Sequence, residues 1–500
     1  MPQVTEVVKI RRRVLAEIAR LSFSGTLKEN IRDILETVVT EGGPRYRCCI
    51  HKERAVLKER IDLALSQPVG TILEVAAENA SNGQLADMPI LTVLPEACDQ
   101  CPIDKFLVTD ACRNCVAHNC ISSCAKKAIM VVNNRAYIDQ SKCVECGLCK
   151  RSCPYSAIIE VSRPCERACD LGAINAGSDR RAVIDYNKCV ECGACKIACP
   201  FGAIDDRSCI AQLITVLKNP EKRVYAILAP AFIGQFGVKT KPGQVMGAVS
   251  RLGFHAVEEV AFGADITTIE EAKEFVRTVP AERPYMTTSC CPAFVGLVEK
   301  HVPEVLPQVS STFSPMMCGG SAIKNNDPDA VVVFVGPCVA KKREALKYPG
   351  AIDFVLTFEE MASMLVGAGI NVTEEPDTGY ETVASRDGNA FARAGGLVQA
   401  VVDAAVHIAP DVQVKPERRE GLGNCMAALQ QLRDGKLDAS FFEGMACYGG
   451  CVGGPGALID ARVTTRLVDV HANTAKIIAS PENKTANEAI AKGSCWHHGH

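Results

Sequence analysis

One cysteine motif occurs twice in this sequence, almost unchanged. It reads CVECGLCKRSCPYSAI from residue 143 and CVECGACKIACPFGAI from residue 189. Each copy has the spacing C-x2-C-x2-C-x3-C-P, which places three close thiolates on three corners of an iron–sulfur cubane. A structural zinc site usually takes two separated cysteine pairs and has no use for a third close thiolate. The motif therefore predicts two [4Fe-4S] clusters rather than zinc.

The motif resembles that of bacterial ferredoxins with two clusters, in which the fourth cysteine of each run binds the other cluster. Applied to the two runs, this exchange rule combines the first three cysteines of one run with the last cysteine of the other. The predicted ligand sets are Cys143, Cys146, Cys149 and Cys199 for one cluster, and Cys189, Cys192, Cys195 and Cys153 for the other.

A degenerate copy of the same pattern surrounds the two runs. Its cysteines are Cys98, Cys101, Cys112, Cys115, Cys120, Cys124, Cys165 and Cys169. The exchange rule predicts two further clusters. Their ligands would be Cys112, Cys115, Cys120 with Cys169, and Cys98, Cys101, Cys165 with Cys124. The alternative is a zinc site formed by the two C-x2-C pairs at 98 and 112. Two to four accessory clusters are therefore expected.

The 27 cysteines could instead form disulfides, if the protein were secreted. The N-terminus argues against export, because Arg11, Arg12 and Arg13 stand where a signal peptide needs an apolar core. No apolar run reaches the ~18 residues that span a bilayer. The net charge of −3 gives no electrostatic attraction for nucleic acid. We expect a cytoplasmic protein without a membrane span and without a nucleic-acid partner.

The remaining sequence predicts a multidomain chain of the α+β and α/β classes. Helical spacing of apolar residues from 7 to 65 predicts a small helical domain, with Thr26 and Glu29 as a capping box. Short β-branched runs at 224–229, 330–336 and 353–358 alternate with helical stretches, which indicates parallel strands. The expected domains are 1–92 (helical), 93–212 (ferredoxin-like iron–sulfur module), 213–480 (two-lobed α/β) and 481–500 (tail).

Three cysteine motifs in the α/β region follow strand-like runs. They are Cys290-Cys291-Pro292, Pro337-Cys338, and Cys447-Tyr448-Gly449-Gly450-Cys451. Open α/β sheets bind ligands beyond the carboxyl ends of their strands. The three segments are therefore expected to converge on one buried metal site.

The segments TSCCPAF (288–294), PCVAKKRE (337–344) and EGMACYGGCVGG (443–454) resemble the three signatures of [FeFe]-hydrogenases, in the same order. FGADITTIEEAKEF (262–275) is similar to the segment before the first signature. The resemblance covers about residues 140 to 460. It implies a reversible reaction, 2H⁺ + 2e⁻ ⇌ H₂, with H₂ and protons as substrates. It also implies a ferredoxin-type electron carrier and a maturation machinery as partners.

The resemblance also implies an H-cluster, a [4Fe-4S] cubane joined to a diiron unit that carries CO, cyanide and an azadithiolate. By position, Cys291, Cys338, Cys447 and Cys451 would bind the cubane, with Cys451 as the bridge to the diiron unit. Cys290 would exchange protons with the azadithiolate amine, Lys341 would donate to a cyanide, and Met445 would pack beside the diiron unit. The chain departs from the usual pattern at Gly336, Phe294 and Tyr448, and Met316 and Met317 lie in a segment that is often more polar.

Glu271 and Glu274 are three residues apart on a predicted helix, and therefore share one of its faces. The resemblance places Ser310 between these two carboxylates and makes the three residues a proton relay to Cys290. Read alone, the acidic stretch is an ordinary solvated helix face.

The alternative functions are a non-catalytic hydrogenase-like protein, either an iron–sulfur assembly factor or an H₂ or redox sensor, and an electron-transfer subunit of a larger complex. The leftover Cys209, Cys318 and Cys425 are expected to be buried small apolar residues. The tail, with Cys495 and several histidines, leaves both metal binding and an unstructured end open.

Overall fold

The computed structural model describes residues 4–99, 101, 105–179, 181–493 and 496–497. Among these residues, no helix has both the length and the apolar character needed to cross a bilayer. Cys495, His498 and His500 of the tail lie outside the described residues.

The N-terminal region is helical, as its apolar spacing predicts. Its helices are α1 (Glu6–Ser24), α2 (Leu27–Asn30), α3 (Asp33–Val38), α4 (Ile50–Ala64) and α5 (Leu73–Ser81). The predicted capping box is wrong, because the side chain of Thr26 makes no capping hydrogen bond. The predicted single helix after Thr26 is in fact two short helices, α2 and α3.

The iron–sulfur region consists of two modules, and the outer module is inserted into the chain of the inner module. The outer module (residues 105–160) contains β2 (Phe106–Val108), α6 (Asn119–Ser122), β3 (Ile129–Val132), β4 (Arg135–Ile138), α7 (Leu148–Ser152) and β5 (Ile158–Glu160). The inner module (residues 91–101 and 161–206) contains β1 (Leu91–Val93), α8 (Pro164–Arg167), β6 (Ile174–Ala176), β7 (Ala182–Ile184), α9 (Ala194–Ala198) and β8 (Ile204–Asp206). Each module has two antiparallel strand pairs, β2–β5 and β3–β4 in the outer one, β1–β8 and β6–β7 in the inner one.

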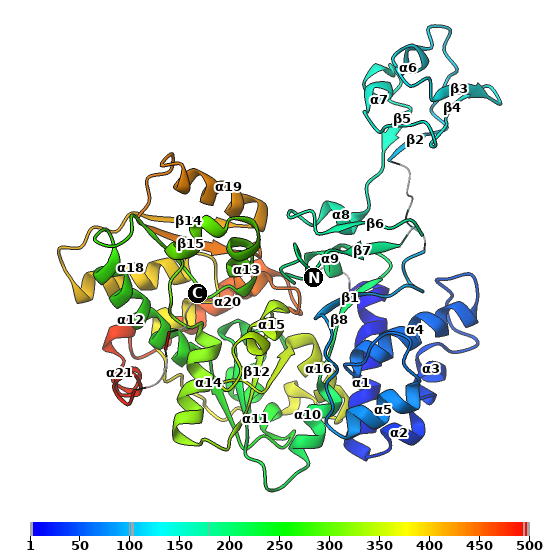
Figure 1. The fold of residues 1–500 in the computed structure, drawn as a ribbon. Coiled ribbons are helices and arrows are strands. Elements are labelled where there is room, and N and C mark those ends of the chain that lie inside the picture. Colours follow the sequence, from blue (N-terminus) through cyan, green and yellow to red (C-terminus); the bar gives the residue numbers. More distant parts are fainter. Residues whose placement is uncertain (1–3, 100, 102–104, 180, 494–495, 498–500) are drawn as a thin grey trace.

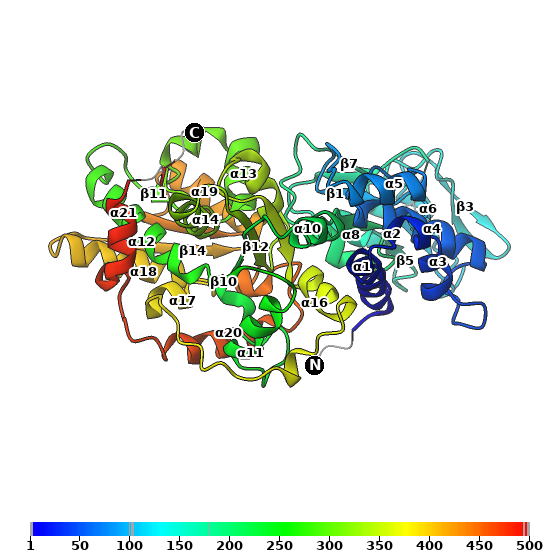
Figure 2. The same ribbon diagram turned by 90° about the horizontal axis from the view of Figure 1, so that it is seen from below.

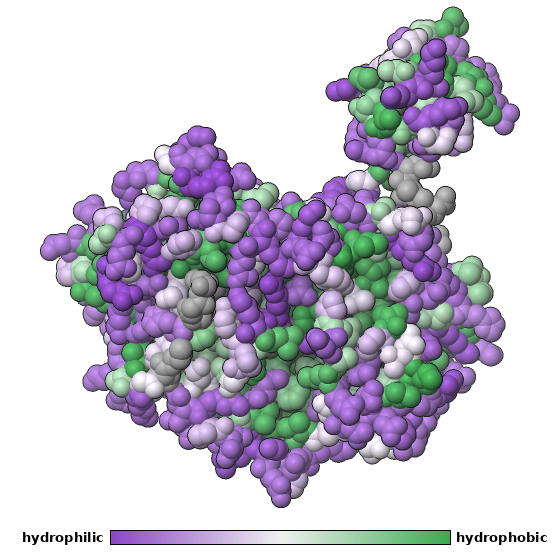
Figure 3. All heavy atoms as spheres, viewed as in Figure 1, coloured by the Kyte–Doolittle hydropathy of each residue, from purple (hydrophilic) through white to green (hydrophobic). Residues whose placement is uncertain are grey.

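The outer module projects away from the rest of the molecule (Figure 1). Apolar residues are exposed on its hairpin, where Met130, Val131, Val132 and Tyr137 are each more than 40% accessible. Figure 3 shows apolar surface on this module as well as polar surface. The inner module lies against the main body, between the N-terminal helices and the C-terminal α/β domain.

The first lobe of the α/β domain is a parallel sheet in the order β10-β9-β12-β13. Its strands are β9 (Val224–Leu228), β10 (Ala256–Glu259), β12 (Val331–Gly336) and β13 (Phe354–Thr357), which confirms the three strand-like runs. Around it pack α10 (Ile210–Leu217), α11 (Pro242–Ser250), α14 (Pro315–Asn326), α15 (Ala340–Lys347) and α16 (Phe358–Gly367). Figure 2 shows α14 on one side of the sheet and α11 with α16 on the other.

The second lobe is a parallel sheet in the order β11-β15-β14. Its strands are β11 (Met286–Thr287), β14 (Pro416–Glu420) and β15 (Phe441–Met445), and its helices are α12 (Ala261–Thr278), α13 (Pro292–His301), α18 (Gly396–Ile408) and α19 (Leu422–Arg433). Adjacent residues of β15 serve opposite faces. Phe441 packs on Phe275 of α12, with ring centroids 5.6 Å apart, and Phe442 packs near Phe294 of α13 at 6.0 Å.

The N-terminal helices and the first lobe share one hydrophobic core. The core includes Ile18 of α1 and Met361 of α16. The two helices approach so closely that a Cβ atom at Gly367 would lie 2.7 Å from the Ala16 carbonyl oxygen. The helical region is thus packed onto the α/β domain rather than separate from it, and the domain limits expected from the sequence stay a prediction.

The C-terminal part of the chain returns to the second lobe. It contains α20 (Ala461–Ala472), which packs on the earlier helix α17 (Arg386–Ala390), and α21 (Lys484–Ala491). Asp265 of α12 anchors this segment, because its carboxylate accepts hydrogen bonds from Ser480 Oγ at 2.8 Å and Asn483 Nδ2 at 2.7 Å. The expected tail from 481 is therefore helical over α21, and Trp496 is buried.

Candidate iron–sulfur and thiol site

The four cysteine repeats, which end at Cys124, Cys153, Cys169 and Cys199, share one backbone feature. This feature supports the sequence-based view that all four are copies of one pattern. Three residues after the last cysteine of each repeat, the chain adopts a left-handed conformation. The residues are Lys127, Ser156, Gly172 and Gly202, with φ of 50°, 49°, 60° and 60°. This turn brings the following Ala-Ile into the core of the module. The degenerate repeats at 120–129 and 165–174 therefore fold like the two regular ones.

The cysteines divide by module, and this division overturns the predicted pairing between the two regular runs. Cys143, Cys149 and Cys153 pack in the core of the outer module, together with Cys112, Cys120 and Cys124. Cys112, Cys115, Cys120 and Cys153 line one pocket. The predicted partners Cys153 and Cys189 belong to different cores, as do Cys149 and Cys199.

The inner module holds the other half of the set. Cys98, Cys165, Cys189, Cys195 and Cys199 share its core, with Cys169 packed against them. Burial raises the pKa of Cys165 to about 11, and Cys199 adds to the increase. Burial likewise raises the pKa of Cys192 to about 12, with contributions from Cys189 and Cys169. The cysteines that lie beside each run thus come from the same module as that run. The zinc alternative is also wrong, because Cys98 and Cys112 lie in different modules.

Backbone N–H groups donate to several of these sulfur atoms. Ala128 N donates to Cys124 Sγ, Ala173 N to Cys169 Sγ, and Ala203 N to Cys199 Sγ, each at 3.3 Å. The donor is four residues after the cysteine in all three repeats. Such hydrogen bonds stabilise thiolate ligands and influence cluster potentials.

The three cysteine motifs of the α/β domain lie where the sequence places them, after parallel strands. Cys290 and Cys291 join β11 to α13, Cys338 joins β12 to α15, and Cys447 and Cys451 follow β15. Since β12 belongs to the first sheet and β11 and β15 belong to the second, the motifs meet between the two lobes.

Four thiols at this junction interact electrostatically, namely those of Cys291, Cys338, Cys447 and Cys451. Burial raises the pKa of Cys338 to about 11 and that of Cys451 to about 12, and Cys291 raises both further. Burial also raises the pKa of Cys447, and the other three thiols add to it. Buried thiolates that repel one another need a compensating cation, and soft thiolates select iron–sulfur groups. Within the described residues, no three His, Cys, Asp or Glu side chains are arranged to hold a single metal ion. The donor chemistry fits a cluster.

Cys290 lies beside the four thiols and is 7% exposed. Burial raises the pKa of its thiol, with further increases from Glu271 and Cys451. Lys341 Nζ donates to the Cys290 carbonyl oxygen at 3.1 Å and pairs with Glu344 Oε2 at 2.6 Å. The buried lysine therefore holds the Cys290 backbone in place. Met445 is also buried, at the end of β15.

The two carboxylates of α12 are buried and stand in opposite charge environments. Burial raises the pKa of Glu271 to about 8, and Glu274 adds to it. The Ser310 hydroxyl and the Ser289 N–H offset this only in part, and neither carboxylate oxygen of Glu271 makes a hydrogen bond of ordinary geometry within the described residues. Burial opposes ionisation of Glu274 too, but hydrogen bonds from Ser311 N and Arg283 hold its pKa below the usual value.

Ser310 lies where the sequence resemblance puts it. Its Oγ donates to Glu274 Oε2 at 2.9 Å, and it also interacts with Glu271. Glu271 is fully buried and Glu274 is 6% exposed. These two positions of α12 therefore do not belong to a solvated helix face.

The inner module contacts the four-thiol site directly. Cys291 raises the pKa of Cys192, and Cys192 raises that of Cys447. Lys300 of α13 donates to the Cys189 carbonyl oxygen at 2.7 Å and fixes the run against the second lobe.

The positions that depart from the family pattern are tightly packed. A Cβ atom at Gly336 would lie 2.5 Å from Phe334 Cζ, so this backbone leaves no room for a side chain. Phe294 covers Gly444, where a Cβ atom would lie 2.1 Å from the ring. Met316 and Met317 are buried, whereas Tyr448 is 68% exposed. Cys318 and Cys425 are buried as expected, and Cys209 is half-buried.

One group of buried charges was missed at the sequence level. Lys342 Nζ donates to Asp206 Oδ2 at 2.6 Å and to Glu360 Oε1 at 2.9 Å, which joins the inner module to α16. Lys196 and Arg11 extend the group through Asp205 and Glu359. Only the position of Lys342, next to Lys341 in the PCVAKKRE segment, could have drawn attention to it.

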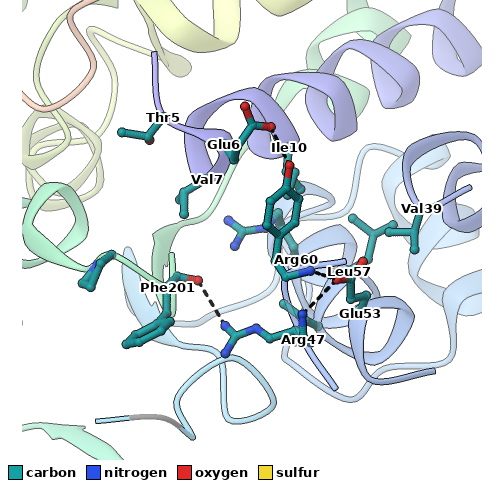
Figure 4. Close-up of a pocket in the computed structure, with 13 residues that line it drawn as sticks. Thr5, Glu6, Val7, Ile10, Val39, Arg47, Glu53, Leu57, Arg60 and Phe201 are labelled. Carbon is teal, nitrogen blue, oxygen red and sulfur yellow. Dashed lines mark hydrogen bonds between the residues drawn. The ribbon is translucent and has the colours of Figure 1, made fainter. Parts of the chain in front are cut away.

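A pocket lies where the N-terminal helices meet the inner module (Figure 4). Arg47 donates to the Phe201 carbonyl oxygen at 3.5 Å, and its guanidinium lies 5.2 Å from the ring centroid of Phe201. The pocket is therefore formed beside the last cysteine run, with Glu53 and Leu57 on its other side.

The chain combines a buried set of four thiols between two parallel sheets with two cysteine modules of the ferredoxin type. This combination defines an iron–sulfur redox protein. The family described as "Iron only hydrogenase large subunit, C-terminal domain" matches residues 222–455. The 4Fe-4S binding domain family matches residues 136–159 and 182–205.

Three relatives place the chain more closely. The periplasmic [Fe] hydrogenase large subunit of Nitratidesulfovibrio vulgaris is 32% identical over 390 residues, which are 66% of this chain and 89% of the relative. Iron hydrogenase 1 of Clostridium pasteurianum is 30% identical over 371 residues, 64% of either chain. Cytosolic iron-sulfur assembly component 3 of Rattus norvegicus is 28% identical over 302 residues, 49% of this chain and 62% of the relative. The chain belongs to the iron-only hydrogenase family.

Proposed function

We propose that this chain is an [FeFe]-hydrogenase that interconverts protons, electrons and H₂. The observation that carries the proposal is the position of Cys290. It is buried beside the four proposed cubane ligands, and it lies in electrostatic contact with Glu271 on its other side. A thiol between a metal site and a buried carboxylate is placed to transfer protons.

The residues proposed to bind the H-cluster are Cys291, Cys338, Cys447 and Cys451. When bound, the diiron unit with its CO, cyanide and azadithiolate ligands would supply the bond-forming chemistry of H₂. The chain itself holds the proton at Cys290 Sγ, fixes that residue through Lys341, and excludes water with buried side chains such as Met445 and Phe294.

Proton delivery is proposed to run from Glu274 to Glu271 and on to Cys290, with Ser310 between the carboxylates. A carboxyl with a pKa raised to about 8 by burial is close to neutrality, which suits a group that takes up and releases protons. Ser310 Oγ already donates to Glu274, so the hydroxyl is placed to exchange hydrogen bonds between them.

Electrons are proposed to pass through four accessory [4Fe-4S] clusters, two in each module. In the outer module the ligands would be Cys112, Cys115, Cys120 with Cys153, and Cys143, Cys146, Cys149 with Cys124. In the inner module they would be Cys98, Cys101, Cys165 with Cys199, and Cys189, Cys192, Cys195 with Cys169. The contacts of Cys192 support the last of these as the donor to the H-cluster. The projecting outer module is then the proposed entry point for a ferredoxin-type carrier.

The decisive experiment is infrared spectroscopy of the maturated protein, combined with an H₂ assay. We expect bands of metal-bound CO and cyanide, and H₂ production from a reduced dye. Cys290→Ala should keep the bands and lose at least about 100-fold in turnover, because a positioned acid–base group contributes 10²–10⁴-fold. Absence of the bands in the wild type would refute the proposal.

The alternatives are a non-catalytic role in iron–sulfur assembly, an H₂ or redox sensor, and a subunit of a larger complex. The similarity to cytosolic iron-sulfur assembly component 3 favours the first of them. That role does not require Cys290 in contact with a buried carboxylate. A protein that binds its cubanes but shows neither infrared bands nor H₂ turnover would support it. The cytoplasmic location stays a prediction.

A further inference from the structure

Trp496 and His497 lie over the outer end of the proposed proton path. Trp496 is 4% exposed and packs on Ile266 and Ile269 of α12. Its carbonyl oxygen accepts a hydrogen bond from Phe313 N at 2.8 Å, and His497 forms an antiparallel bridge with Thr312. His497 therefore pairs as a one-residue β-bridge with the 310–313 segment. The same segment donates hydrogen bonds to Glu274.

His497 makes two hydrogen bonds in this position. Its Nδ1 lies 3.1 Å from Ser311 Oγ, and its Nε2 lies 3.2 Å from Glu270 Oε2. Ser311 is the same residue whose backbone N–H donates to both carboxylate oxygens of Glu274, at 3.1 Å each. One serine thus stands between the imidazole and the outer carboxylate of the path.

Glu274 needs such a neighbour, because it is isolated from solvent. Its side chain is 5% exposed, and that of its ion-pair partner Arg283 is 10% exposed. An arginine guanidinium does not give up its proton in proteins, so Arg283 stays charged and cannot pass a proton on. The side chain of His497 is 42% exposed. Imidazole both takes and gives protons in the neutral range.

We propose that His497 is the residue at which this chain exchanges protons with bulk water. The inference rests on the proposed hydrogenase function. A proton from a buffer acid binds Nε2 of the neutral imidazole that carries its proton on Nδ1, and the Nδ1 proton of the resulting imidazolium moves to Ser311 Oγ. The hydroxyl proton that Ser311 gives up is taken by the Glu274 carboxylate. The imidazole, now protonated on Nε2 only, returns to its first tautomer by exchange with water, and the reverse sequence releases a proton during H₂ oxidation.

The charged groups around His497 suit this role. Glu270 Oε2 lies 3.2 Å from Nε2 of the imidazole, and Glu270 is itself held by Lys273 Nζ at 2.8 Å, both on α12. On the other side lie Glu274 and Arg283 as an ion pair.

The test compares His497→Ala and His497→Gln with the wild type in the complete, maturated protein. We expect both variants to lose at least about 10-fold in H₂ production at saturating reduced dye, with infrared bands unchanged. Imidazole added to the buffer should restore His497→Ala, because it replaces the missing base. The pH profile should also steepen, since direct exchange with Glu274 depends on hydronium or hydroxide. His407→Gln, at an exposed histidine of α18, is the matched control and should change nothing.

A structural role alone would give a different pattern. It would lower the melting temperature and would not respond to imidazole. Labelling with diethyl pyrocarbonate, followed by peptide mass mapping, provides a readout without turnover, because an imidazole that exchanges protons with bulk water should be acylated, and a His497 that resists acylation would contradict the inference. Wild-type turnover that is untouched by both substitutions would overturn the inference and leave the proposed function standing. A wild type without H₂ turnover would overturn both.

Discussion

Gly193 and Pro455 are in such close contact that a Cβ atom at position 193 would lie 2.8 Å from the proline Cγ. Gly193 precedes α9 with a φ of 82°, in the left-handed region that favours glycine. It directly follows Cys192, whereas Pro455 lies just beyond Cys451. The approach of the inner module to the four-thiol site therefore depends on the absence of a side chain at this point.

Gly193→Ala is expected to lower the free energy of unfolding by about 2–4 kcal/mol, because the backbone cost adds to a clash with Pro455. Urea denaturation at 25 °C measures it. Gly172→Ala is the control, since Gly172 has a φ of 60° but nothing within 4 Å of a Cβ atom. It should cost only about 1–2 kcal/mol. Equal losses in the two variants would mean that the contact with Pro455 is unimportant.

Lys342→Met is expected to destabilise the protein by about 3–5 kcal/mol, because Asp206 and Glu360 would remain buried without their cation. The comparison is Lys347→Met on the same helix, whose partner Glu299 is more exposed. That variant should lose less than about 1 kcal/mol. Thermal and urea unfolding of both proteins provide the measurement, and a small loss for Lys342→Met would contradict the role assigned to the group.

Glu271→Gln is expected to make the free energy of unfolding fall less than that of the wild type as the pH rises. The carboxyl has a pKa of about 8 in the folded protein and about 4.5 when unfolded, so the wild type loses stability as the pH rises between these values. The cost approaches about 1.4 kcal/mol for each pH unit crossed. The variant should therefore gain on the wild type from pH 5 to 8 in urea titrations.

Glu274→Gln should show the opposite trend. The pKa of Glu274 is lowered, so its carboxylate contributes stability above the unfolded value of about 4.5 that is lost as the pH falls through the folded value. This variant should be less stable than the wild type at pH 7, and the difference should shrink in acid. Parallel pH curves for the two variants would contradict the opposite environments described for the carboxylates.

Replacement of residues 105–160 by a short Gly-rich linker is expected to remove two clusters, or about eight iron atoms, and to leave those of the inner module in place. The reason is that, in the proposed assignment, each module supplies all four cysteines of its own clusters. Iron and sulfide analysis measures the loss. A protein that also loses the inner clusters would restore the pairing between the 143 and 189 runs.

The three cysteine motifs of the α/β domain were predictable because strand ends and cysteine positions are local properties. The run VVVFVG before Cys338 and FFEGM before Cys447 are buried parallel strands, and open sheets place ligands at their carboxyl ends. The pairing of the cysteine runs was not predictable in this way. The runs at 143 and 189 are nearly identical because each has the spacing that binds a cubane. This similarity does not reveal which other cysteine run lies beside each of them in the fold.

Long-range partners account for the other differences. The pairing of Lys342 with Asp206 joins residues 136 positions apart, and His497 meets Ser311 across 186 positions. Neither pair has a spacing that marks it in the sequence. The division between α2 and α3 falls at Ile31 and Arg32, which both keep right-handed helical backbone angles, so Ile31 and Ile34 still lie on one face and both reach the core shared with the α/β domain.

The insertion of one module into the other has a consequence for how the protein is made. Cys98 and Cys101 leave the ribosome well before Cys165 and Cys199, and the whole outer module is synthesised in between. The outer module can close as soon as residue 160 has emerged, because all its cysteines are then present. The inner module must wait with its first strand unpaired until β8 arrives to pair with β1. Since domains generally fold as units during synthesis, the outer module would complete its fold first, and the inner module would expose its unpaired first strand until its second half appears.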